Sequence, residues 1–209
     1  MVDANAPVAK EFSFFHSSSH LNLFIVPGAR SAKDCKPDKE AIYYVENSLF
    51  SKHKADVTMR EGATKEGRPV AACKMRFSFG TNNIALGDPE NPNTRWEMMQ
   101  RKGHFKNRHW VFDFPVAGAE SKRHPFIWKR TRGVGNMKLV DGETGDIVAQ
   151  YMSNYLKRWR KAGKMVLYRD YGEQWTLLVL VGYLALLEKA RRRHRSAIAG
   201  GAAGASGGA

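Results

Sequence analysis

An uncharged stretch over residues 175–187 constrains this chain more than any other feature of its sequence. A helix that crosses a bilayer needs about 20 apolar residues, because the hydrocarbon core is about 30 Å thick. This stretch would reach only about 20 Å at the helical rise of about 1.5 Å per residue. It is not an amphipathic surface helix either, since residues 177–181 are consecutive and make every face apolar. We therefore expect a helix over residues 173–193 that the rest of the fold encloses on all sides.

The chain before residue 170 predicts a series of short β-strands, because β-branched and aromatic segments alternate with turn-forming ones such as DGETG at 141–145. Strands that close into a barrel leave no exposed edges and can cover a helix that threads the lumen. The alternative is a β-sandwich with the helix on one face, which would leave half of the helix exposed. The candidate strands are 21–26, 41–46, 55–60, 69–79, 95–100, 109–114, 125–131, 137–141, 146–155 and 164–170.

A length of 209 residues and a hydrophobic content of 43% predict a single globular domain. We expect this domain over residues 13–195, with disordered tails over 1–12 and 196–209. The second tail consists mostly of Gly, Ala and Ser, which bury too little apolar surface to fold. Cys35 and Cys73 lack the spacing of a zinc site, so we expect two free thiols and a reducing compartment.

The formal net charge of +14 favours anionic partners, which include nucleic acid, anionic lipid head groups and phosphorylated ligands. A solvated basic surface without a partner is the alternative. The basic residues gather in three groups. They are Arg101, Lys102, Lys106 and Arg108; then Lys122, Arg123, Lys129, Arg130 and Arg132; then Lys157, Arg158, Arg160, Lys161 and Lys164.

The third group surrounds Trp159, and this mixture suits a bilayer interface, where an indole lies at head-group depth beside cations. It also suits a nucleic-acid backbone with one stacking platform, or a solvated hairpin whose tryptophan covers the end of the barrel. The candidate lipid- or anion-binding residues are Lys129, Arg130, Arg132, Lys157, Arg158, Trp159, Arg160 and Lys161.

The sequence contains no recognisable catalytic or metal-binding arrangement. His16 and His20 are four residues apart but have no carboxylate neighbours, and the carboxylates are scattered at turns. We therefore expect no enzymatic activity, no metal site and no cofactor.

Three segments in this order, FIWKRT, MKLVDGETGDIVAQY and KAGKMVLYRDYGEQWTLLVLVGYLALLEKARRR, resemble the tubby C-terminal-like superfamily. This group includes tubby-like proteins, LURP-one-related proteins and phospholipid scramblases, and the chain looks most like fungal members that carry only this domain. The similarity is clearest over residues 126–193. It includes a D-x-x-T-G-x-x-V-A pattern from Asp141 to Ala149 and a G-x-M-x-L pattern from Gly163 to Leu167.

The resemblance implies a closed antiparallel β-barrel of about twelve strands around a central hydrophobic C-terminal helix. Tubby-like domains bind membrane phosphoinositides through basic residues on the barrel exterior, although no ligand set can be placed residue by residue on this chain. We expect a non-enzymatic, monomeric, cytoplasmic module that engages anionic membrane lipids peripherally. An intracellular scaffold or protein-interaction domain is the alternative. Nucleic-acid binding is less favoured because RNA-binding motifs are absent, and the RRRHR run at 191–195 leaves a nuclear location open.

Overall fold

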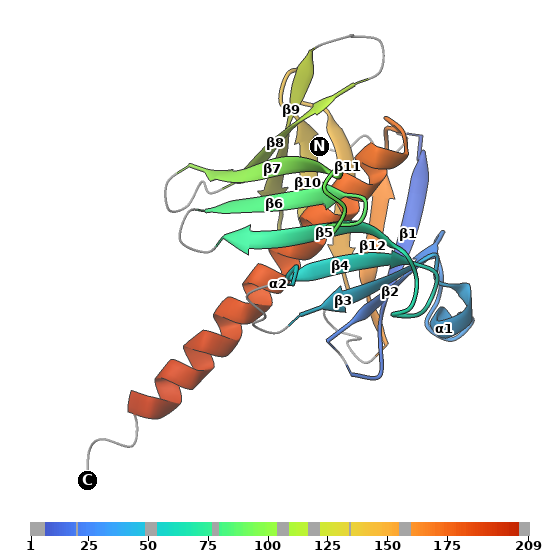
Figure 1. Ribbon diagram of the computed structural model, residues 1–209, viewed down its shortest axis with the longest axis vertical. Helices are drawn as coiled ribbons and strands as arrows, with labels where there is room; N and C mark the ends of the chain where they lie inside the picture. The colour runs from blue at the N-terminus through green and yellow to red at the C-terminus, as the bar shows by residue number, and fades with distance from the viewer. Residues whose placement is uncertain are drawn as a thin grey trace.

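The chain folds into one closed antiparallel barrel in which each strand pairs with its neighbours in sequence and β1 closes on β12 (Figure 1). The computed structural model describes residues 7–19, 21–48, 54–76, 80–103, 109–116, 122–133, 135–154 and 160–204. The strands are β1 (Lys10–His16), β2 (Leu23–Pro27), β3 (Tyr43–Asn47), β4 (Val57–Glu61), β5 (Pro69–Arg76), β6 (Thr81–Leu86), β7 (Arg95–Lys102), β8 (His109–Pro115), β9 (Arg123–Arg130), β10 (Met137–Asp141), β11 (Ile147–Ser153) and β12 (Lys161–Leu167). The helices are α1 (Pro37–Glu40) and α2 (Glu173–Gly204).

The apolar part of α2 runs through the barrel, as the sequence predicts (Figure 1). Leu178 is 0% exposed and Leu184 is 2% exposed, so different faces of the helix are covered. Inward side chains from the strands complete one continuous core around it. Tyr183 of α2, for example, stacks on Tyr151 of β11 with ring centroids 3.9 Å apart. A sandwich with the helix on one face would leave half of these residues exposed, so the barrel is confirmed.

Both ends of the barrel domain differ from the expected boundaries. Strand β1 begins at Lys10, which pairs with Leu167, so residues 10–12 belong to the barrel because Phe12 is buried in its core. Helix α2 continues to Gly204, past the expected end at residue 193 and past the domain boundary at 195. Extension of an existing helix needs no new nucleus, and alanine favours it.

Two strands, β1 and β6, are absent from the strands expected from sequence. Successive side chains of a strand point to opposite faces, and in β1 this places the adjacent Phe14 and Phe15 in different clusters. Phe14 lies in the main core, and Phe15 packs outside the barrel with Cys35 under the β2–β3 connection that contains α1. The barrel therefore has a second, smaller apolar cluster on its outer face.

The helix distinguishes the two ends of the barrel. It begins at the helix-entry end, where Trp175 packs edge-on against Phe126 in the first half of β9. It leaves at the helix-exit end, where Lys189 Nζ donates a hydrogen bond to Asn82 Oδ1 at the start of β6. Because the strands alternate in direction, every odd-numbered strand ends at the helix-exit end and every even-numbered strand begins there.

Candidate anion-binding end of the barrel

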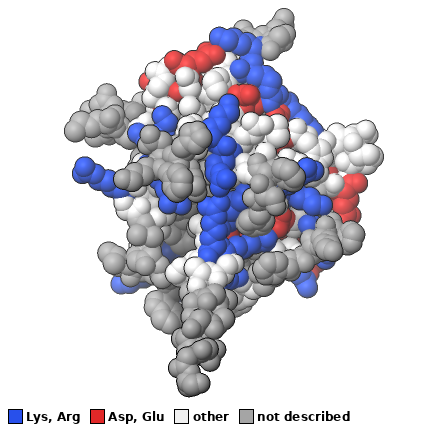
Figure 2. Space-filling view, turned by 90° about the vertical axis from the view of Figure 1, so that its left-hand side faces the viewer, with Lys and Arg blue, Asp and Glu red and all other residues white. Residues whose placement is uncertain are grey.

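The helix-exit end carries a concentration of exposed Lys and Arg side chains. They come from strand ends, from the turns between odd-numbered and even-numbered strands, and from α2. Figure 2 shows this end, with Lys and Arg running across it and Asp and Glu toward its margins. The exposed cations, called here the basic end, are Lys54, Arg76, Arg101, Lys102, Lys129, Arg130, Arg132, Arg160, Arg193 and Arg195.

These cations outnumber the carboxylates of the described residues beside them. Among the described strand ends and turns of the helix-exit end and on α2 beside them, the carboxylates are Glu46, Asp56 and Glu188, and arginines already neutralise all three. Arg60 Nε lies 3.3 Å from Glu46. Arg192 contacts both Asp56 at 2.6 Å and Glu188 at 2.9 Å. The basic end therefore has a strong excess of positive charge.

The helix-entry end is different because several of its cations are paired with carboxylates. Lys10 contacts Asp170 at 3.0 Å, Arg68 contacts Glu61 at 2.6 Å, and Arg95 contacts Glu97 at 2.6 Å. The carboxylates of the described strand ends and turns there include Glu61, Glu66, Asp88, Glu90, Glu97, Asp113, Glu143, Asp146, Asp170 and Glu173. The charge of the molecule is thus segregated along the barrel axis.

A buried polar network holds α2 at the helix-exit end. Arg192 donates to Asp56, Glu188 and the carbonyl of Ser48, at 2.6, 2.9 and 2.7 Å. Asp56 also accepts a hydrogen bond from the backbone N–H of Met75 at 2.7 Å. The network connects the helix to the β3–β4 connection and to β5, so the surrounding cations project from a fixed frame.

The positive field of this end acts on Lys189, which lies just inside it. The pKa of Lys189 is lowered to about 8, chiefly by burial and also by repulsion from Arg193 and Arg101, against attraction by Cys73 and Asp56. The ammonium lies over the Trp110 ring, 4.5 Å from its centroid. A lysine with a lowered pKa is the expected response of a buried amine to nearby cations.

The structure brings together four of the sequence-predicted site residues at this end. Lys129 and Arg130 are exposed at the end of β9, Arg132 is exposed in the turn that follows, and Arg160 is exposed immediately before β12. Strands β10 and β11 separate the two groups, and the direction of the strands places both at the same end. Lys157, Arg158 and Trp159 lie outside the described residues.

Lys161, another predicted site residue, has a packing contact in the structure. Its Nζ donates to the carbonyl of Arg30 and lies over the Phe15 ring, 5.9 Å from the centroid. Burial lowers its pKa, and repulsion by Lys164 adds to this effect. The side chain therefore connects the β2–β3 connection to the barrel.

Basic residues that are close together in the sequence do not all lie at the same end of the barrel. Lys122 and Arg123 belong to the group of Lys129 in sequence, yet they lie at the helix-entry end and pair with Glu143 and Glu97. The structure adds Lys54, Arg76, Arg193 and Arg195 to the candidate site. Arg76 could have been found from sequence, because it faces outward in the alternation of the KMRFSF segment.

Charge-assisted hydrogen bonds from arginines and lysines can bind phosphate or carboxylate groups, so the chemistry of this end is anion binding. Within the described ranges, no group of three or more His, Cys, Asp and Glu side chains could hold a metal ion. A search of the same ranges finds no helix that combines the length and the apolar character needed to cross a bilayer.

These features define a class of protein, a closed twelve-stranded barrel with a core helix and one basic end. A solved X-ray structure of a protein from Arabidopsis thaliana has a similar fold, with a TM-score of 0.52. The similarity covers 88% of this chain and 96% of that chain at 14% sequence identity, so it concerns the fold alone. No protein-family model and no curated protein matches the sequence.

Proposed function

We propose that this protein is a non-enzymatic module that docks the basic end of its barrel on anionic membrane lipids. The observation that carries the proposal is the segregation of charge. Cations at the helix-exit end outnumber the local carboxylates, which arginines already neutralise, whereas Lys10, Arg68 and Arg95 at the helix-entry end are ion-paired. A surface basic only for solubility does not require this polarity.

The path of α2 is compatible with docking through this end. The helix emerges there, and residues 196–204 contain no charged residue (Figure 1). This segment can approach or enter the head-group layer without burying a charge, which would be costly in an apolar medium. The cations of the basic end would then contact the lipid phosphates around the inserted segment.

The expected affinity is modest and sensitive to salt. Each Lys or Arg near an anionic membrane surface contributes about 1 kcal/mol, and the effect decays over a Debye length of about 8 Å at physiological ionic strength. The four predicted site residues that are exposed here, Lys129, Arg130, Arg132 and Arg160, would together supply about 4 kcal/mol. That value corresponds to reversible peripheral binding.

Sedimentation with vesicles tests the proposal. We expect the protein to pellet with phosphatidylglycerol or phosphoinositide vesicles at low salt and to remain in solution with phosphatidylcholine. The triple substitution Lys129→Gln, Arg130→Gln and Arg132→Gln should weaken this binding at least about tenfold. The matched control, Lys65→Gln, Arg68→Gln and Lys122→Gln, removes the same charge from the helix-entry end and should have a much smaller effect.

Two results would decide against lipid docking. If wild-type protein does not distinguish anionic from neutral vesicles, the scaffold or protein-interaction function takes its place. If both triple variants lose binding equally, net charge and not the basic end accounts for it. RNA added as a competitor tests the nucleic-acid alternative. A protein that binds RNA through the basic end would dissociate from the vesicles at low RNA concentration.

We also infer a distant relationship to the tubby C-terminal-like superfamily. Support comes from the barrel around a core helix, from the fold shared with the Arabidopsis protein, and from the sequence patterns at Asp141–Ala149 and Gly163–Leu167. A phosphoinositide preference and a cytoplasmic, membrane-peripheral location belong to the same proposal, and the vesicle panel addresses the lipid preference directly.

A further inference from the structure

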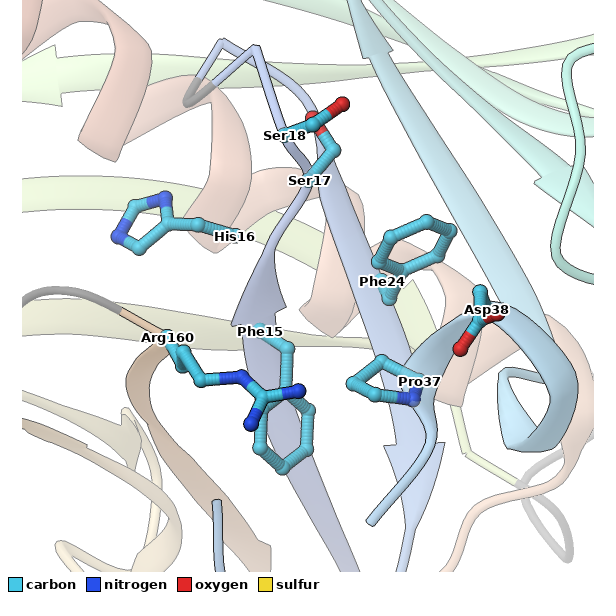
Figure 3. A pocket seen from close by; sticks show the side chains of 8 residues that line it. All are labelled: Phe15, His16, Ser17, Ser18, Phe24, Pro37, Asp38 and Arg160. Carbon is cyan, nitrogen blue, oxygen red and sulfur yellow. The ribbon is translucent and has the colours of Figure 1, made fainter. Parts of the chain in front are cut away.

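A groove of about 310 Å³ lies beside the basic end, between the β1–β2 turn and the β2–β3 connection (Figure 3). This volume is at the low end of those that hold small ligands. Arg160 and His16 lie on one side of the groove, and Pro37, Asp38 and Phe24 lie on the other. Its lining residues are Phe15, His16, Ser17, Ser18, Phe24, Pro37, Asp38 and Arg160.

The first side of the groove suits a phosphate. The guanidinium of Arg160 is exposed, and the backbone N–H of His16 donates to the carbonyl of Arg160 at 2.8 Å, which fixes the two residues beside each other. Ser18 adds an exposed hydroxyl, and the hydroxyl of the buried Ser17 is hydrogen-bonded to Ser19 Oγ at 2.9 Å. Guanidinium, imidazole and hydroxyl donors are the groups that proteins use to bind phosphate oxygens.

The second side suits a primary ammonium. The carboxylate of Asp38 is exposed at the rim and Phe24 presents an aromatic ring nearby. The Phe24 ring packs against Tyr44 with centroids 5.6 Å apart, so its position is fixed. A carboxylate accepts hydrogen bonds from an ammonium, and an aromatic face attracts a cation.

We propose that this groove binds a phosphate ester that carries a primary amine, of the phosphoethanolamine type. The phosphate lies against Arg160 and His16, and the ammonium lies against Asp38 over Phe24. Inorganic phosphate would meet the Asp38 carboxylate unfavourably, and a simple amine would meet the Arg160 guanidinium unfavourably. Only a ligand with both charges satisfies both sides. The lipid form of this ligand rests on the proposed membrane docking, and the soluble form does not.

Solution NMR titration of the full chain tests the groove with three probes: phosphoethanolamine, inorganic phosphate and ethanolamine. Phosphoethanolamine should bind at least about tenfold more tightly than either of the others, because it gains a second charge-assisted contact. Asp38→Asn should reduce its affinity to that of inorganic phosphate, and Arg160→Gln should reduce it to that of ethanolamine. The control Asp34→Asn removes an exposed carboxylate of the same connection that does not line the groove, and it should change nothing.

Equal affinities for phosphoethanolamine and inorganic phosphate would overturn the proposal, and so would an Asp38→Asn variant that binds phosphoethanolamine like wild type. Vesicles then distinguish the two sources of a bound ligand. Retention on phosphatidylethanolamine vesicles that depends on Asp38 identifies a lipid head group, and soluble binding alone identifies a free phosphate ester. Phosphatidylglycerol has no amine. A protein that binds phosphatidylglycerol vesicles but does not bind phosphoethanolamine would refute the proposed groove ligand and leave the membrane-docking proposal intact.

Discussion

Replacing Arg192 by methionine is expected to destabilise the protein by about 3 kcal/mol, because one buried guanidinium serves two carboxylates. Arg192 contacts Asp56 at 2.6 Å and Glu188 at 2.9 Å, and it also donates to the carbonyl of Ser48 at 2.7 Å. Methionine keeps the apolar stem of the side chain and removes its charged guanidinium. The substitution therefore tests the ion-pair network with little change in packing.

The magnitude follows from what each carboxylate retains. Removal of one partner from a buried ion pair costs about 3–5 kcal/mol, since a charge remains in a poorly solvated site. Asp56 is 17% exposed at its side chain and still accepts the N–H of Met75, and Glu188 still has Arg191 at 4.0 Å. These compensations place the loss near the lower value. Asp56→Asn keeps an acceptor for Met75 and leaves the Glu188 pair in place, so its cost should be about 1–2 kcal/mol.

Urea unfolding followed by tryptophan fluorescence gives the free energies of unfolding. The control is Arg195→Met, which removes an exposed arginine from the same helix and should change stability by at most about 0.5 kcal/mol. If Arg192→Met and Arg195→Met have the same effect, the network does not hold α2 in the barrel and our account of this end is wrong.

Two further predictions concern α2. The lowered pKa of Lys189, about 8 against an ordinary 10.5, means that the unfolded chain binds more protons between these pH values. This residue alone should therefore make stability rise with pH, by about 1–2 kcal/mol from pH 8 to 10. The buried Cys73 thiol, with its raised pKa, makes stability fall as pH rises. The measurement is therefore the free energy of unfolding of the wild type minus that of Lys189→Met at each pH. A difference that does not change with pH would contradict the lowered pKa of Lys189. Gly182→Ala should raise the free energy of unfolding by about 0.5–1 kcal/mol, because the added methyl would meet Trp128, Ile84 and Met99 at 3.6 to 3.8 Å, which is ordinary contact; a lower melting temperature would show that the lumen has no room for it.

The enclosure of α2 was predictable because it depends on one local property, a helix with no polar face. The strands from β7 to β11 were equally accessible, since alternation and turn chemistry are local. The turn at 141–145 shows this directly. Asp141 Oδ1 accepts the backbone N–H groups of Glu143 and Thr144, and Gly145 takes a φ of 81° that favours glycine.

Strand β6 could not be found in this way because its pattern depends on a distant residue. Asn82 is 0% exposed and faces the lumen, where an apolar residue is expected. Its side chain accepts the hydrogen bond of Lys189, which lies 107 positions later in the chain. Strand β1 was missed for a related reason, since Phe15 faces outward, where a polar residue is expected, under a cover that the β2–β3 connection supplies. The contact of Lys161 could not be predicted from the sequence either, because the carbonyl that it binds belongs to the distant Arg30.

The position of the basic end follows from strand parity. In an antiparallel barrel, successive turns alternate between the two ends, so segments in every second turn meet at one end. Arg101 and Lys102 precede the β7–β8 turn, Arg132 lies in the β9–β10 turn, and Arg160 lies in the β11–β12 turn. Lys122 lies one turn out of step, in the β8–β9 turn, and is therefore at the opposite end. Neither missed strand lies beyond residue 95, so the strands expected there place each of these turns at the correct end of the barrel. The segregation of charge in this region could therefore be predicted from the sequence.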